Sequence, residues 1–153
     1  ILKRIKKGTN SRQQIEAGKW VMAAGMELSM YVILGIGGKE RTIPHALESA
    51  KVLNQIEPDF IRLRTFVPKI DTPLLQEIQN RGFQMLGPHE VLKEISLFIR
   101  NLKADSYLAS DHYTNYINLE GRLSEKKTKF LEQTDAALKM DESAFRPFFI
   151  GTS

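Results

Sequence analysis

A strand, a helix and a second strand, predicted in immediate succession, constrain the fold of this chain most. Residues 28–34 (Leu-Ser-Met-Tyr-Val-Ile-Leu) are mostly apolar and lie between glycines, which is typical of a strand buried on both faces of a parallel sheet. Residues 42–56 carry an apolar stripe at helical spacing, with Thr42 as the predicted cap and Pro44 in the first turn. Residues 59–66 follow as a second strand. This order predicts two parallel strands joined by a crossover helix.

Further elements are predicted on both sides of this unit. A helix over residues 10–24 begins with a capping-box pattern, in which Ser11 is followed by Gln14 three residues later. Three more helices are predicted at residues 72–80, 87–102 and 124–139, and a short third strand at residues 106–109. The alternation of strands and helices predicts an α/β fold. Because three parallel strands leave two open edges, we expect further strands to complete the sheet.

Composition excludes several kinds of chemistry. The 153 residues include no cysteine, so this chain forms no disulfide, thiolate zinc site or cysteine-held iron–sulfur cluster. The three histidines lack metal-ligand spacing, and His45 and His89 are interpreted as surface or capping residues. No Ser/His/Asp or paired-carboxylate arrangement supports hydrolytic catalysis. The longest apolar run, residues 30–36, is far shorter than the roughly 20 residues that cross a bilayer, so we expect a cytoplasmic protein without membrane contact.

A glycine-rich turn, Gly35-Ile-Gly-Gly38, follows the first predicted strand. Parallel strands bind ligands at their carboxyl ends, and glycines there let a ligand approach the backbone. The turn lacks the Gly-Lys-Ser/Thr ending of a P-loop and the third glycine of a dinucleotide-binding fingerprint. A ligand site and a plain strand-to-helix turn therefore both stay open as interpretations.

Two other groups of residues are candidates for function. Arg62 and Arg64 fall on one face of the second strand, where guanidinium groups need a carboxylate or phosphate partner or a cavity such as a barrel interior. The alternative is that they face helices and pair with Asp or Glu there, or that they extend outward into solvent. Asp111, His112 and Asn115 lie in a polar, tyrosine-containing loop after the third strand, and this composition favours a substrate-contacting loop over a capping turn.

The chain opens with a basic segment, residues 2–7 (Leu-Lys-Arg-Ile-Lys-Lys), which is typical of a helix end closing on Gly8. Together with the first residue, Ile1, which is not methionine, this pattern predicts a piece of a longer polypeptide. The same cations are compatible with an RNA-associated accessory domain. Because the net charge is only +4, a solvated helix end is the favoured interpretation and a nucleic-acid partner is not expected.

Taken in order, these segments resemble the C-terminal half of a radical S-adenosylmethionine (SAM) enzyme. The resemblance rests on residues 2–8, Ala23-Ala-Gly25, Tyr31-Val-Ile-Leu-Gly-Ile-Gly-Gly38, Asp59-Phe-Ile-Arg-Leu-Arg-Thr-Phe-Val-Pro68 and Asp71-Thr-Pro-Leu74. It spans about residues 1–119 and is closest to the branch that contains the oxygen-independent coproporphyrinogen oxidases. Asp71 stands where that branch has the glycine of a Gly-Thr-Pro-Leu turn.

The resemblance implies a fold and an activity. Residues 1–120 would form parallel βα units, the C-terminal half of a partial (β/α)6, TIM-like barrel, and residues 121–153 a C-terminal helix and docking tail. The intact parent would be an oxidoreductase or transferase that holds a [4Fe–4S] cluster on an N-terminal Cys-x3-Cys-x2-Cys loop. It would cleave SAM reductively to a 5′-deoxyadenosyl radical, which abstracts hydrogen from a substrate that the sequence does not identify. We expect this chain to be inactive without the N-terminal barrel half.

The resemblance also assigns residues to the cavity. The positions that match its SAM-binding side are Leu34, Gly35, Gly37 and Gly38, with Arg62 or Arg64 toward the SAM carboxylate, the ribose or an anionic substrate. The positions expected to face substrate are Asp111, His112 and Asn115. No catalytic residue and no metal ligand is assigned in this chain. The main alternative is a small α/β module that binds a nucleotide or phosphorylated ligand at the Gly35 turn without catalysis.

Overall fold

The computed structural model describes residues 1–152. One four-stranded sheet has the order β1-β2-β3-β4, with bounds Ser29–Leu34, Phe60–Thr65, Tyr107–Ala109 and Glu120–Arg122. The helices are α1 (Ser11–Ala23), α2 (Gly38–Ile56), α3 (Pro73–Gln79), α4 (Pro88–Asn101) and α5 (Leu123–Ala137), with a 3-10 turn, η1, at Glu142–Ala144. β1, β2 and β3 are parallel and β4 is antiparallel to β3. The α/β fold predicted from the alternation of elements is confirmed.

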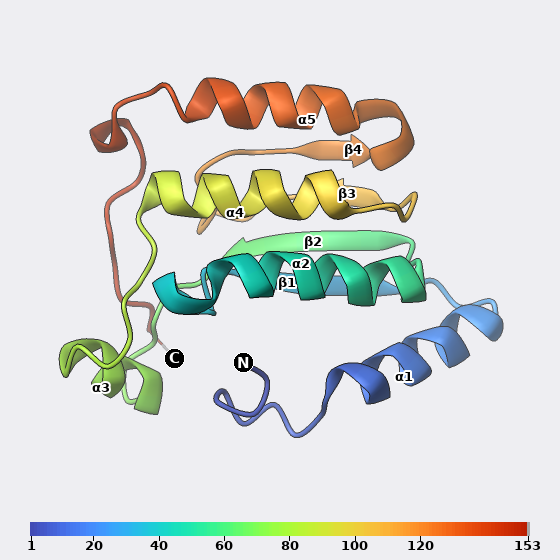
Figure 1. Cartoon of the computed structure of the whole chain (residues 1–153), viewed down its shortest axis with the longest axis horizontal. Coiled ribbons are helices and arrows are strands. Elements are labelled where there is room, and N and C mark those ends of the chain that lie inside the picture. Colours follow the sequence, from blue (N-terminus) through green and yellow to red (C-terminus); the bar gives the residue numbers. More distant parts are fainter. Residues whose placement is uncertain (153) are drawn as a thin grey trace.

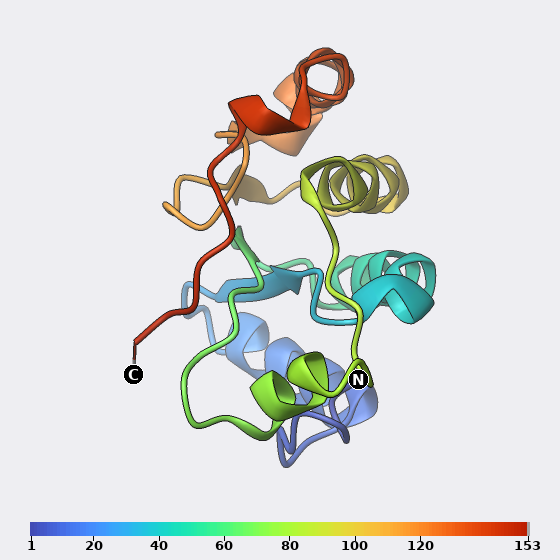
Figure 2. The ribbon, with the colours of Figure 1, turned by 90° about the vertical axis from the view of Figure 1, so that its left-hand side faces the viewer.

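The helices that pack on the sheet all lie on one of its faces. In Figure 1, α2, α4 and α5 lie in front of the strands, and α1 continues the row by packing against α2. Figure 2 looks onto the carboxyl ends of β1 and β2 and has α2 and α4 on the same side of the sheet. No helix within residues 1–152 has the length and apolar character of a membrane span. The opposite face of the sheet carries no helical layer within residues 1–152.

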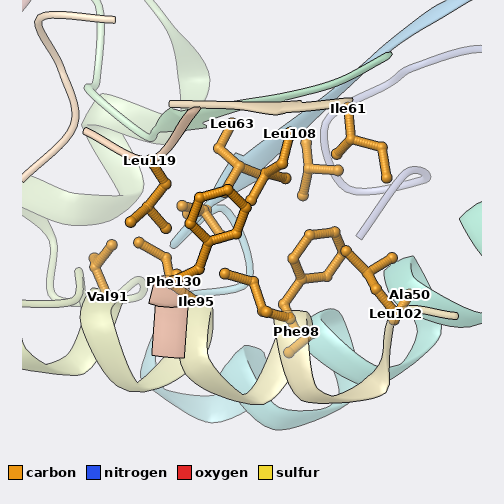
Figure 3. Close-up of a cluster of buried hydrophobic side chains, with 14 of the residues drawn as sticks. Ala50, Ile61, Leu63, Val91, Ile95, Phe98, Leu102, Leu108, Leu119 and Phe130 are labelled. Atoms are coloured by element: carbon orange, nitrogen blue, oxygen red, sulfur yellow. The ribbon is translucent and has the colours of Figure 1, made fainter. Parts of the chain in front are cut away.

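The hydrophobic core lies between the sheet and α4 (Figure 3). Ile61 and Leu63 occupy alternate positions of β2, so both side chains point toward the helices, where they are buried near Phe98 of α4. Burial of each such side chain contributes about 1.5–3 kcal/mol. Phe130 of α5 and Leu119, which precedes β4, belong to the same cluster. The C-terminal helix thus shares one core with the strands.

The second face of the sheet is open. Tyr31 and Ile33 of β1 are 55% and 40% exposed, and they lie beside Arg62 and Arg64 in the register of β2. The prediction that β1 is buried on both faces is wrong, because no helix in the described part of the chain covers the side that carries Tyr31 and Ile33. The prediction that the two arginines share a face is confirmed, and that face is the open one.

The N-caps of two helices lie earlier in the chain than predicted. Asn10 caps α1 and forms a capping box with Gln13, one residue before the predicted pair. α2 begins at Gly38, directly after the glycine turn, so Thr42 lies inside the helix and is not its cap. The N-terminus of α3 is as predicted, since Thr72 accepts the Leu75 N–H.

The C-terminal third contains features that no strand pattern indicated. β4 is only three residues long and was not predicted, but it pairs with β3 across Leu108 and Gly121. In the tail that follows α5, Phe145 packs against the core. Its end pairs with the segment after β2, where Gly151 bridges to Lys69. In Figure 2 the tail descends on the side of the sheet opposite to α2 and α4.

Candidate ligand-binding site

A cavity of about 570 Å³ lies at the carboxyl ends of β1 and β2, on the open face of the sheet. Ile33 and Arg64 reach it from the strands, and Ile36 reaches it from the glycine turn. His112 and Tyr113 line it from the loop after β3, and both chain ends contribute to its rim. Its volume falls within the roughly 300–1,000 Å³ of small-molecule sites. We therefore take this cavity as the candidate site.

The two arginines of β2 have different surroundings. The guanidinium of Arg64 lies 4.8 Å from the ring centroid of Tyr31 and lines the cavity. The guanidinium of Arg62 lies 5.7 Å from the ring centroid of Phe60 and donates from Nε to Ser29 Oγ at 3.2 Å, near the amino end of the strands. Neither arginine forms an ion pair within residues 1–152. Arg64 is thus the arginine that faces the cavity.

His112 presents one free ring nitrogen. Its Nδ1 accepts the Thr114 N–H at 3.3 Å and lies 2.8 Å from the Thr114 hydroxyl, so Nε2 carries the proton of the neutral ring. Desolvation lowers the pKa of His112 below its ordinary value, the charge of Arg64 lowers it further, and Asp111 opposes both. At neutral pH the ring is therefore an uncharged hydrogen-bond donor through Nε2.

Beyond the end of β3, the side-chain amide of Asn115 forms the hydrogen bonds to β2 that the backbone of a neighbouring strand would otherwise form. Its Oδ1 accepts the Thr65 N–H at 2.7 Å, and its Nδ2 donates to the carbonyls of Leu63 at 2.9 Å and Ser110 at 3.0 Å. The side-chain amide thereby continues the hydrogen bonding of β2 and anchors the loop that carries His112. Of the three loop residues predicted to face substrate, only His112 lines the cavity; Asp111 is exposed outside it.

The glycine turn is packed inside the protein. Gly35 and Gly38 have φ angles of +78° and +63°, and a Cβ on Gly38 would lie 3.0 Å from the Gln84 carbonyl oxygen. Leu34 points into the core, and Gly37 is buried as well. Packing and backbone conformation explain why glycines occur here. The cavity reaches the turn at Ile36, and the predicted contact of a ligand with the glycine backbone stays a prediction.

A buried carboxylate that sequence reasoning missed holds the glycine turn. Glu94 of α4 is 2% exposed; it accepts the Gly35 N–H at 3.0 Å and the Thr42 hydroxyl at 3.1 Å. His45 Nδ1 lies 2.5 Å from its other oxygen, so the interpretation of His45 as a surface or capping residue is wrong. Glu94 lies three residues after Val91, inside the apolar stripe of α4, and this position was the available signal.

Neither a metal centre nor a match to a known protein was found. Within the described residues, 1–152, no group of three His, Cys, Asp or Glu side chains could hold a metal ion. No protein-family model, curated protein or solved structure matches the chain.

Proposed function

We propose that this chain is the C-terminal half of the partial (β/α)6 barrel of a radical SAM enzyme, and that the open sheet face is a wall of its ligand cavity. The observation that carries this proposal is the one-sided helical layer over strands that follow chain order from β1 to β3. Doubly wound sheets carry helices on both faces, whereas barrels carry them outside and keep the inner face for side chains and ligands. A cationic cavity at the carboxyl ends of the strands supports the same assignment.

The edge of β1 supports an N-terminal partner half. α1 packs closely on α2, with the Gly18 Cβ position 2.7 Å from Ile56 Cγ2, yet β1 has no strand on its outer edge within residues 1–152. The row of helices thus extends one element beyond the sheet (Figure 1). A second hollow, of about 550 Å³, lies there between the N-terminal turns, β1 and α2. A preceding parallel strand would pair with β1 under α1.

The cavity offers surfaces that suit two parts of SAM, its nucleoside and its carboxylate, but this chain offers no ligand for the iron–sulfur cluster. Ile33, Ile36 and Phe66 give the cavity apolar surface for a nucleoside, and its cations suit a carboxylate. The cluster would be held by the N-terminal half, because this chain has no cysteine. When bound, the two cofactors would supply the one-electron cleavage of SAM. The part of this chain would be to orient ligands and to exclude water from them.

The deciding experiment uses the intact open reading frame that contains this chain. The protein is reconstituted anaerobically with iron and sulfide, and 5′-deoxyadenosine formation from SAM is measured under reducing conditions. We expect product from the intact protein and none from the 153-residue chain. An upstream sequence without a cysteine triad, together with no cluster absorbance and no product, would contradict the proposal.

A non-catalytic module that binds a phosphorylated ligand is the second candidate. The observation that favours it is the preformed cavity with cations in this chain alone. It predicts ligand binding by the 153 residues without any other polypeptide, whereas the radical SAM proposal predicts that SAM binding requires the N-terminal half. Calorimetric titration of both proteins with SAM separates the two.

A further inference from the structure

Positive charge in the cavity is not balanced by the side chains of residues 1–152. Arg4, Lys6, Arg64 and Lys69 line the cavity, and the one carboxylate that lines it, Glu77, forms an ion pair with Arg4. The other three cations form no ion pair with any described residue. Cations that converge on a cavity without carboxylate partners favour an anionic ligand.

Arg64 is held in place before any ligand binds. Its guanidinium rests on the ring of Tyr31 at 4.8 Å, a cation–π contact that restricts its position. Stacking leaves the N–H edge of the guanidinium open, and none of its nitrogens donates to another residue in the described part of the chain. A preorganised fork of this kind loses little side-chain entropy when it binds an oxyanion.

Lys69 and His112 face the same space from other segments. The backbone around Lys69 is fixed by the tail, since the Ile70 N–H donates to the Gly151 carbonyl at 3.2 Å and the Gly151 N–H donates to the Pro68 carbonyl at 2.9 Å. The ring of His112 is fixed through Nδ1 by Thr114, which leaves the Nε2–H for a ligand. Arg64 lies near the end of β2, Lys69 follows β2, and His112 follows β3. None of the three belongs to the glycine turn after β1.

We propose that Arg64, Lys69 and His112 form a subsite for a doubly charged oxyanion, such as a phosphate monoester, of the substrate. Two full positive charges match the charge of this group, and the neutral imidazole adds a donor for a third oxygen. The ring centroid of Tyr113 lies 4.4 Å from that of His112, and Tyr113 gives the subsite an aromatic surface for the rest of the ligand. The term substrate rests on the proposed function, whereas the oxyanion subsite belongs to this chain alone.

The test measures binding of inorganic phosphate to the 153-residue chain by NMR, at constant ionic strength. We expect saturable shifts of the His112 ring signals, and a rise in the His112 pKa, since a bound anion offsets the charge of Arg64. Arg64→Gln should weaken phosphate binding about tenfold or more, the loss of one charge-assisted contact. Arg62→Gln is the matched control, with the same charge change on the same strand face outside the cavity.

Each alternative outcome would count against the subsite. Equal weakening by Arg62→Gln and Arg64→Gln would show diffuse surface attraction, and the absence of saturable His112 shifts would remove the subsite altogether. Displacement of phosphate by methionine would assign the subsite to the SAM carboxylate and overturn its assignment to substrate. This test needs neither the cluster nor SAM cleavage. Phosphate binding by this chain, together with an intact protein that has no cysteine triad, no cluster absorbance and no 5′-deoxyadenosine formation, would leave the subsite standing and the proposed function refuted.

Discussion

At the scale of single residues, the buried carboxylate of Glu94 ties α4 to α2 and to the glycine turn. Three donors depend on it: the Gly35 N–H, the Thr42 hydroxyl and the His45 ring. An unpaired buried polar group is costly, so the network is worth most when all of its members are present. The turn that ends β1 at the cavity therefore owes its shape to a residue near the middle of a distant helix.

Glu94→Ala should lower the free energy of unfolding by about 3 kcal/mol, because it leaves a cavity and three donors without an acceptor. Glu94→Gln should cost less, since an amide oxygen still accepts from Gly35 and Thr42. The measurement is urea unfolding, with the exposed Glu132→Ala on α5 as control. A loss for Glu94→Ala no larger than that of the control would contradict the role given to this carboxylate.

The lowered pKa of His112 makes stability depend on pH in a defined direction. Below the ordinary histidine pKa the unfolded chain binds a proton that the folded chain resists, so stability is lost as pH falls through the interval between that value and the lower folded pKa. Arg64→Gln removes the second cause of the shift and should raise the His112 pKa, while desolvation still holds it below the ordinary value. NMR titration of the ring measures this, and Arg62→Gln should leave it unchanged. A fall in the His112 pKa of Arg64→Gln would contradict the electrostatic coupling.

The sequence predicted which kinds of residues occur near the candidate site, but not which of them line the cavity. Arg62 and Arg64 were equivalent in the sequence, and only stacking on Phe60 or Tyr31 and the position along β2 separate them. Asn115 was predicted to face substrate because its residue type suits that role. Its structural role depends on where β3 ends, which a chain pattern does not give.

At the scale of elements, the side chain of Asn115 extends the hydrogen bonding between β2 and β3 beyond their last paired residues. The paired residues of β2 and β3 end at Arg62 and Ala109, and beyond them the amide of Asn115 takes the place of a strand residue. The three-residue β3 is thereby enough to hold the loop of the cavity against β2.

Asn115→Ala should expose the Thr65 N–H to solvent exchange, because Asn115 Oδ1 is its acceptor at 2.7 Å. We expect loss of protection at the Thr65 amide and a decrease of about 2 kcal/mol in the free energy of unfolding. The Phe66 amide, which donates to the Leu34 carbonyl at 2.8 Å, is the internal control and should stay protected. Residue-resolved hydrogen exchange gives the answer. Unchanged exchange at Thr65 would contradict the ladder role.

The long periodic helices were predicted well, whereas the strand β4 and the exposed face of β1 were missed. The apolar stripe of α4 was readable because helix burial repeats along fourteen residues. β4 has three residues, too few for any period to appear. β1 looked buried on both faces because Tyr31 and Ile33 are apolar, although the structure leaves their side of the sheet open.

At the scale of the whole molecule, the row of helices extends one helix, α1, beyond the β1 edge of the sheet. Within residues 1–152, no strand lies beneath α1; the helix packs against α2, where Gly18 allows the two helices to approach closely. The fold class followed from the order of strands and helices. Which face stays open could not be predicted, because it depends on how far the row of helices continues and on what lies against β1.

Gly18→Leu should detach α1 from α2, because even a Cβ at residue 18 would lie 2.7 Å from Ile56 Cγ2. We expect a loss of about 1–3 kcal/mol in the free energy of unfolding, typical of overpacking. Ala17→Leu, at an exposed position on the same helix, should have little effect. Thermal and urea unfolding compare the two variants. Equal stability of both would contradict the close packing at Gly18.

The two edges of the sheet differ in a way that governs how copies of this chain can meet. The β4 edge carries the exposed charges of Glu120 and Arg122, which discourage strand pairing, whereas β1 has no charged residue. A filament requires two sheet edges per copy that can pair with another strand, and within residues 1–152 only the β1 edge lacks charged residues. Without the N-terminal strand proposed to cover β1, any edge-to-edge contact between copies would join β1 to β1 about a twofold axis and stop at a closed pair.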